Sequence, residues 1–135
     1  ASSTLTACYA TGSVTSSGSG TIYTGGVTGT NDCGTLTACY HANGTVSGPD
    51  GTTGGVTGRN FKILTWDGAV ITACYWRSNP DTGIGYNEGG STTIETTKVT
   101  DGDWQNAVTQ MNAALQNAGS EWRYELTGEL PTLKK

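Results

Sequence analysis

The sequence predicts an α+β fold, in which an antiparallel β-sheet built from hairpins carries a C-terminal amphipathic helix packed on one face. Short segments of strand-like residues separated by glycine-rich turns fill the chain up to about residue 99. A helical repeat of apolar residues follows them. The 135 residues are enough for one domain with a modest core, and 21 glycines with only 13% charged side chains favour many short strands.

The clearest strand signal is a hexamer that recurs along the chain. Thr-Leu-Thr-Ala-Cys-Tyr occupies 4–9 and 35–40, and Val-Ile-Thr-Ala-Cys-Tyr occupies 70–75. Alternation of side chains along a strand predicts that Leu5, Ala7 and Tyr9 share one face and that Cys8 lies on the other.

A second repeat accompanies the hexamer. Thr-Gly-Gly-Val-Thr-Gly occurs at 24–29 and 53–58, and successive cysteines of the hexamers are 31 and 35 residues apart. A duplicated strand–turn–strand unit explains these matches, and so does convergence, because the residues involved are common in strands. A stacked solenoid would need about three full repeats, and here a helix cuts the third repeat short.

The centre of the chain predicts the strongest hairpin. Strands over 61–66 and 69–77 are expected to join at the tight turn Asp67-Gly68. The glycine-rich stretch 78–90 predicts a long loop, and the threonine-rich 91–99 a further strand.

The C-terminal part predicts one helix over 100–119. Trp104, Val108, Met111 and Leu115 lie on one apolar face, and Gly119 is the natural stop. The opposite face is polar but uncharged, which suits either contacts between copies or an ordinary surface. Residues 120–127 fit a closing strand or a second short helix.

The chain is expected to form a single domain, 1–135. Its predicted sections are a Thr/Gly-rich β region at 1–60, central strands and the long loop at 61–99, the helix at 100–119, and a C-terminal segment at 120–135.

Charge and cysteine content narrow the range of functions. The net charge of −4 lacks the basic excess typical of proteins that bind duplex nucleic acid. Cys8, Cys33, Cys39 and Cys74 contain no closely spaced pair of the kind that holds zinc, so no metal or cofactor is expected. These cysteines form disulfides, within or between chains, or remain buried thiols. No apolar run is long enough to span a membrane.

No catalytic motif stands out, so an enzyme is not expected. The single histidine, His41, is expected in an exposed loop without the third group that a nucleophilic triad needs. Trp66, Trp76 and Tyr86 suit either stacking on sugars, as in a carbohydrate-binding module, or the core.

The order of the last elements resembles a known family. A strand over Thr92 to Val99, the run Thr100-Asp101-Gly102-Asp103-Trp104 and the helical stripe to Leu115 resemble the coat proteins of single-stranded RNA bacteriophages. The resemblance implies that two chains pair into one continuous sheet with interlocking helices. It also implies that the inner sheet face contacts single-stranded RNA, with Arg59, Lys62 and Arg77 as the nearest cations.

The sequence therefore favours a self-assembling structural protein. The leading hypothesis is a coat subunit of a virion that forms a homodimer and higher assemblies through a helix face of Trp104, Val108, Met111 and Leu115. One alternative is an extracellular filament or cell-surface appendage subunit with cysteines bridging its duplicated strands. The other is the carbohydrate-binding module.

Overall fold

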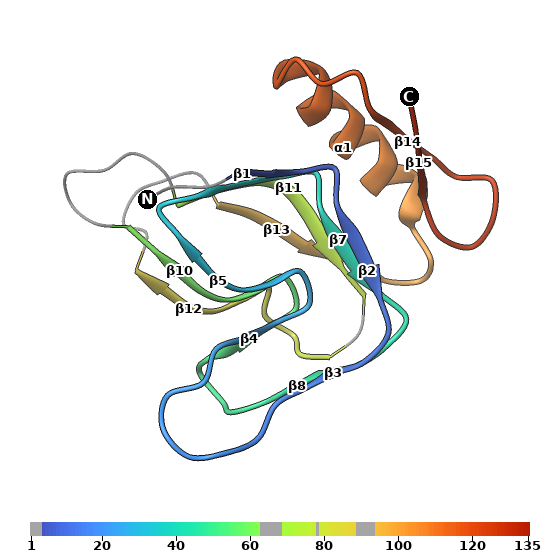
Figure 1. Cartoon of the computed structure of the whole chain (residues 1–135). Helices are drawn as coiled ribbons and strands as arrows, with labels where there is room; N and C mark the ends of the chain where they lie inside the picture. Colours follow the sequence, from blue (N-terminus) through green and yellow to red (C-terminus); the bar gives the residue numbers. More distant parts are fainter. Residues whose placement is uncertain (1–3, 63–68, 78, 89–93) are drawn as a thin grey trace.

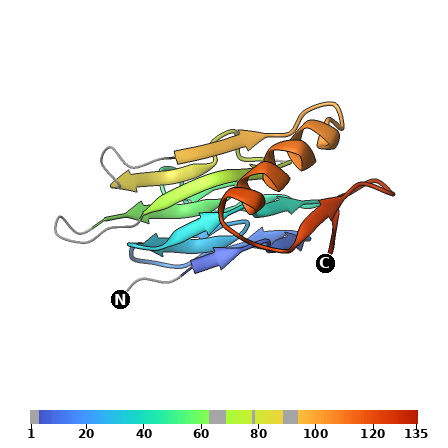
Figure 2. The same ribbon diagram turned by 90° about the horizontal axis from the view of Figure 1, so that it is seen from above.

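The computed structural model describes residues 4–62, 69–77, 79–88 and 94–135. The chain winds into coils, and each coil lies directly on the one before it (Figures 1 and 2). The strands of successive coils pair in parallel, whereas the strands of a hairpin must be antiparallel. The predicted antiparallel sheet of hairpins is therefore wrong, and the described residues form a short parallel β-solenoid with one helix.

Each coil is made of very short strands. The first coil contains β1 (Thr4–Thr6), β2 (Tyr9–Thr11), β3 (Val14–Thr15), β4 (Thr24–Gly25) and β5 (Thr28–Asp32). The second contains β6 (Thr35–Thr37), β7 (Tyr40–Ala42), β8 (Val46–Ser47), β9 (Thr53–Gly54) and β10 (Thr57–Phe61). The third contains β11 (Val70–Trp76) and β12 (Ile84–Glu88), and β13 (Ile94–Lys98) pairs with β11 to begin a fourth turn.

The recurring sequence motifs are structurally equivalent. Leu5 pairs with Leu36, and Leu36 pairs with Ile71, so the three hexamers open three successive coils in register. The two Thr-Gly-Gly-Val-Thr-Gly segments also stack, as β4 on β9. The repeat thus encodes the stack, because residues at matching positions form the ladder between neighbouring strands.

The predicted central hairpin is replaced by a connection between coils. β10 pairs with β5 and β12, whereas β11 pairs with β6, β7 and β13, so the two segments belong to different sheets. The turn at Asp67-Gly68 lies outside the described residues. The stretch 78–90, expected to be a loop, contains β12.

A bend inside each hexamer changes the predicted faces. Ala7, Ala38 and Ala73 all have a left-handed backbone, with φ of 56°, 55° and 50°. This bend breaks the two-residue alternation, so Leu36 and Cys39 point into the coil while Ala38 and Tyr40 point outward.

The Gly-Gly pairs allow the two walls of the coil to touch. A Cβ atom at Gly26 would lie 2.7 Å from the Cβ of His41, and one at Gly55 would overlap the indole of Trp76. The two walls therefore meet closely at these positions, and side chains fill the rest of the interior. That inner core contains Leu36, Cys39, Val56, Ile71, Cys74 and Trp76.

The predicted helix is confirmed as α1 (Trp104–Asn117), which covers the outer face of the β6–β11 wall (Figure 1). Gly119 ends it in the left-handed region, and the Ser120 amide donates to the Leu115 carbonyl, as in a Schellman cap. Asp103 makes no side-chain capping bond.

The closing-strand interpretation of 120–127 is confirmed. β14 (Arg123–Glu125) pairs antiparallel with β15 (Thr132–Lys134). Together with α1, this hairpin covers an outer core that contains Tyr40, Trp104, Met111 and Tyr124. In the described part of the chain, no helix is both long and apolar enough to cross a membrane.

Candidate functional site

The inner core is open where the first coil ends the stack. Leu36, Cys39 and Val56 in the second coil are at most 1% exposed. Their first-coil counterparts, Leu5, Cys8 and Val27, are only partly buried. The same residue types are therefore enclosed in the middle of the stack and uncovered at its end.

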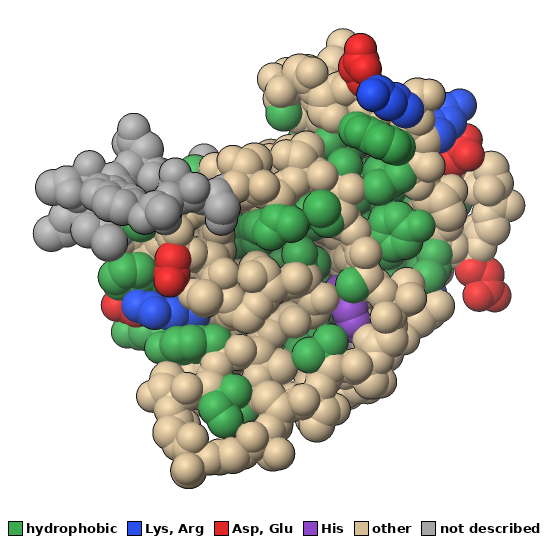
Figure 3. All heavy atoms as spheres, in the orientation of Figure 1, with side chains coloured by type: hydrophobic (Ala, Val, Ile, Leu, Met, Phe, Trp, Pro, Cys, Tyr) green, Lys and Arg blue, Asp and Glu red, His purple; other side chains and the backbone are tan. Residues whose placement is uncertain are grey.

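The tyrosine ladder on the outer wall shows the same gradient. Tyr9 stacks on Tyr40 with ring centroids 5.0 Å apart and nearly parallel planes. Tyr40 is fully buried, whereas Tyr9 is 43% exposed. We call the surface formed by Leu5, Cys8, Tyr9 and Val27 the first-coil end. Figure 3 looks onto this end of the stack, where hydrophobic side chains reach the surface.

The opposite end of the stack is also open. Ile84 and Ile94 are partly buried there, and Tyr86 is 47% exposed. Asn87 is exposed as well, although its second-coil counterpart Asn60 is fully buried. We call these four residues, carried by β12 and β13, the last-coil end.

Each end carries one acidic residue at the same register position. Asp32 and Glu88 both pair with Phe61, from opposite sides. Asp32 accepts a hydrogen bond of 2.7 Å from the Thr30 hydroxyl, and Glu88 forms an ion pair with Arg59 at 3.3 Å. The charges of the two ends are thus alike at this position.

The three hexamer cysteines form a column inside the coil. Cys8, Cys39 and Cys74 each donate to the carbonyl oxygen two residues earlier, at 3.4–3.5 Å. All four cysteines of the chain are thiols, and Cys33 is buried at the end of the first coil. No group of three or more histidine, cysteine or acidic side chains among the described residues is arranged to hold a metal ion.

The structure does not bring the predicted RNA-binding cations together. Arg59 lies on β10, paired with Glu88 and over the ring of Phe61 at 4.1 Å. Lys62 follows the same strand, whereas Arg77 is exposed beyond the end of β11 in the other sheet. The guanidinium of Arg59 already interacts with Glu88 and Phe61 of its own chain. These three cations therefore do not form one basic surface.

The predicted assembly face of the helix is buried within the single chain. Trp104, Val108, Met111 and Leu115 are at most 6% exposed and pack against the outer wall of the coils. This face is therefore already covered. The ends of the coils are the surfaces that present unfinished core.

The aromatic residues considered for sugar binding do not form one platform. Trp76 is 4% exposed, and its indole nitrogen donates to the Pro80 carbonyl at 2.8 Å. Tyr86 is exposed on β12, and Trp66 lies outside the described residues. His41, expected on the surface, is fully buried, with Nε2 2.6 Å from the Gly12 carbonyl oxygen.

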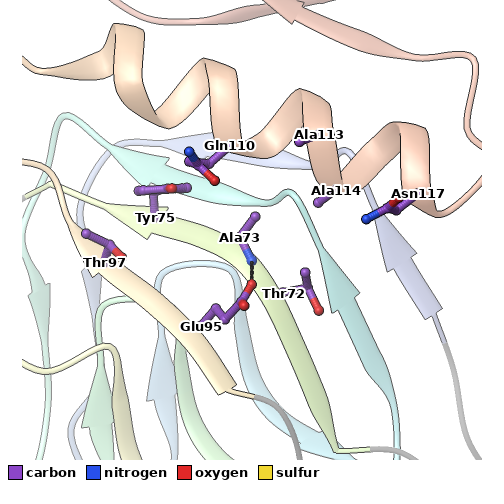
Figure 4. A pocket seen from close by; sticks show the side chains of 9 residues that line it. All are labelled: Thr72, Ala73, Tyr75, Glu95, Thr97, Gln110, Ala113, Ala114 and Asn117. Carbon is purple, nitrogen blue, oxygen red and sulfur yellow. Dashed lines mark hydrogen bonds between the residues drawn. The ribbon is translucent and has the colours of Figure 1, made fainter.

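A polar groove of about 390 Å³ separates α1 from β11 and β13 (Figure 4). It arises where the register of β13 shifts between Ile71 and Cys74. In the first two coils the amides of Ala7 and Ala38 bond to the next coil's carbonyls, but the Ala73 amide bonds to the Glu95 carboxylate at 3.2 Å. Glu95 replaces a missing backbone acceptor and closes the ladder. The groove is lined by Thr72, Ala73, Tyr75, Glu95, Thr97, Gln110, Ala113, Ala114 and Asn117.

No protein-family model, curated protein or solved structure matches this chain. The candidate site therefore depends on the structure alone. The sequence did contain one signal for it, since the hexamer repeat marks which first-coil residues are equivalent to buried ones. Without the knowledge that the repeats stack in parallel, that equivalence could not be used.

Proposed function

We propose that this chain is a self-assembling structural subunit whose copies stack end to end. One observation carries the proposal: Leu5, Cys8 and Val27 are only partly buried, while a further coil fully buries their second-coil counterparts. Burying apolar surface is the main driving force for association. A second copy supplies a coil of the same width and chemistry.

The register inside the chain defines how two copies would meet. At the last-coil end β13 already covers β11, so β1 of one copy would lie on β13 of the next. Leu5 would then face Ile94 of the next copy, as Leu36 faces Ile71 within the chain. Backbone groups of edge strands, which otherwise bond to water, would extend the parallel ladder.

A contact between two different ends of a molecule leaves one free end on each of the two copies. Such a head-to-tail interface generates a filament when the rotation between copies is open. Among the structural hypotheses, this favours the filament or appendage subunit over the coat subunit, whose predicted sheet is not present. A virion location and contact with single-stranded RNA stay predictions.

One pair of like charges opposes this contact and provides a way to test it. When two copies stack head to tail, Asp32 of one copy approaches Glu88 of the next from the same register position, and like charges that approach each other repel. Association should therefore strengthen when either charge is removed. Asp32→Asn is the better variant, because Glu88 also pairs with Arg59.

Sedimentation velocity over a concentration series, followed by negative-stain microscopy, tests the proposal. We expect the wild-type chain to form larger species as concentration rises, and Asp32→Asn to form them at lower concentration. Leu5→Glu should abolish them, because it places a charge on the first-coil end.

Gln105→Glu is the matched control for that variant. It adds the same charge to an exposed position on the helix, outside the residues that form the two coil ends, and should leave association unchanged. A wild-type chain that stays monomeric at high micromolar concentration would refute the proposal. Equal loss of association in Gln105→Glu and Leu5→Glu would do so as well.

A further inference from the structure

The column of three thiols has the geometry of a thiol–disulfide exchange site. Thr6 pairs with Thr37 and Tyr9 with Tyr40, so Cys8 lies opposite Cys39 on adjacent parallel strands. Thr72 and Tyr75 place Cys74 opposite Cys39 from the other side. Neighbouring strands are about 4.8 Å apart, which falls inside the roughly 4.4–6.8 Å between Cα atoms that a disulfide spans.

We propose that Cys8 and Cys39 form a site that reacts with low-molecular-weight disulfides and becomes an internal disulfide joining the first two coils. Cys8 is the entry point, because it lies at the first-coil end and is partly exposed, whereas Cys39 and Cys74 are fully buried. The inference does not depend on self-assembly.

The reaction proceeds in two exchange steps. The Cys8 thiolate attacks one sulfur of the small disulfide RSSR, which forms a Cys8–SR mixed disulfide and releases one thiolate, RS⁻. The Cys39 thiolate then attacks Sγ of Cys8, forms the Cys8–Cys39 bond and releases the second RS⁻. Two cysteine thiols are oxidised, and RSSR is reduced to two RSH.

The surroundings of Cys39 suit the second step. Its pKa is lowered, first by interaction with the Cys74 thiol and also by Cys8, against the opposing effect of burial. Burial and the neighbouring Cys39 raise the pKa of Cys8. A larger thiolate fraction at Cys39 favours attack on a mixed disulfide held beside it.

Cys74 has the opposite character and supports Cys39 rather than competing with it. Interaction with the Cys39 thiol, together with burial, raises the pKa of Cys74. Cys33 belongs to neither pair, since it lies beyond β5 at the other end of the wall. The expected product is therefore one defined disulfide rather than a mixture.

The test is incubation of dilute, native protein with oxidised glutathione, followed by peptide mass mapping under non-reducing conditions. Dilution keeps the first-coil end uncovered, so a failure here is distinguishable from a failure of end-to-end stacking. We expect the chain to lose the mass of two hydrogens, and peptides containing Cys8 and Cys39 to be found joined.

Two variants separate the steps. Cys39→Ser should stop at the first exchange and retain one glutathione on Cys8, whereas Cys74→Ser, the matched control, should still form the Cys8–Cys39 bond. If Cys8 and Cys39 of the oxidised wild-type chain are both still alkylated after the chain is unfolded, the proposal is overturned. A disulfide that joins a peptide containing Cys33 to another peptide would also overturn the proposal. Wild-type mapping alone decides the question if a variant does not fold.

Discussion

The asparagine ladder offers the sharpest test of how the coils are held together. Asn60 is fully buried in the second coil, where its side chain accepts a hydrogen bond from Asn31 at 2.9 Å. It donates to the Ala69 carbonyl at 3.0 Å and to the Asn87 side chain at 3.1 Å. One side chain thus links all three coils and the connection into the third.

Replacement by alanine should remove all three bonds. Each is worth about 0.5–1.5 kcal/mol, and Asn60 is fully buried, so Asn60→Ala should cost roughly 3–4 kcal/mol. Asn87→Ala should cost less than about 1 kcal/mol, because Asn87 is exposed and water replaces its bonds. Asn31→Ala loses the hydrogen bonds to Asn60 and to the Gly34 carbonyl. Its cost in stability should lie between the costs of Asn87→Ala and Asn60→Ala.

The assay is urea unfolding of dilute protein followed by tryptophan fluorescence, with midpoints compared at a common slope. The order of the three costs matters more than their absolute size. If Asn87→Ala destabilises the protein as much as Asn60→Ala does, burial is not what makes the ladder strong. An effect of Asn60→Ala below that of Asn31→Ala would also contradict the argument.

Three further predictions concern pH, packing and the closed ladder. Burial raises the pKa values of Tyr40 and Tyr124 above their ordinary value of 10.0, so the unfolded chain ionises first and stability should fall as pH rises above 10. Above pH 10 the free energy of unfolding should fall by about 1.4 kcal/mol per pH unit for each tyrosine. Tyr40→Phe or Tyr124→Phe should remove the contribution of one tyrosine, measured by urea titrations at pH 9–11. Gly55→Ala should cost at least about 1–3 kcal/mol through overlap with Trp76. Gly128→Ala, which meets no atom within 4 Å, should change thermal stability little, and equal effects would contradict the close-wall argument. Glu95→Ala should speed hydrogen exchange at the Ala73 amide, while Glu95→Gln, which keeps an acceptor oxygen, should not; identical exchange in both variants would show that Glu95 does not close the ladder.

The helix was predictable because its signal is local. Trp104, Val108, Met111 and Leu115 recur at helical spacing, and Gly119 supplies the left-handed residue that ends the helix. Both features are contained in about fifteen consecutive residues. Packing against the coils adds stability but does not change which face is apolar.

The sheet was not predictable in the same way, because strand alternation does not specify a partner. The spacing between Cys8, Cys39 and Cys74 held that information, since equal positions in a stack lie one coil apart. The left-handed bend at Ala38 could not be foreseen, because alanine normally avoids this conformation. β12 was not predicted because it forms a strand through pairing with β10 rather than through a pattern of apolar side chains.

The candidate site was hidden for a related reason. Leu5, Cys8 and Tyr9 look the same in sequence as Leu36, Cys39 and Tyr40, and only their place in the stack makes one set exposed. The cations were assigned by nearness to predicted strands, and Arg59 proved to be held by Glu88 and Phe61.

The length of α1 limits how much of the outer wall it can cover. Its 14 residues span about 21 Å at 1.5 Å per residue, which is no more than about four strand spacings of 4.8 Å. The helix runs obliquely across the stacked strands (Figure 2), so a chain with an inserted coil would leave part of its outer wall bare. Growth of this architecture within a single polypeptide would require a longer helix, whereas addition of whole molecules would bring a new helix with every three coils.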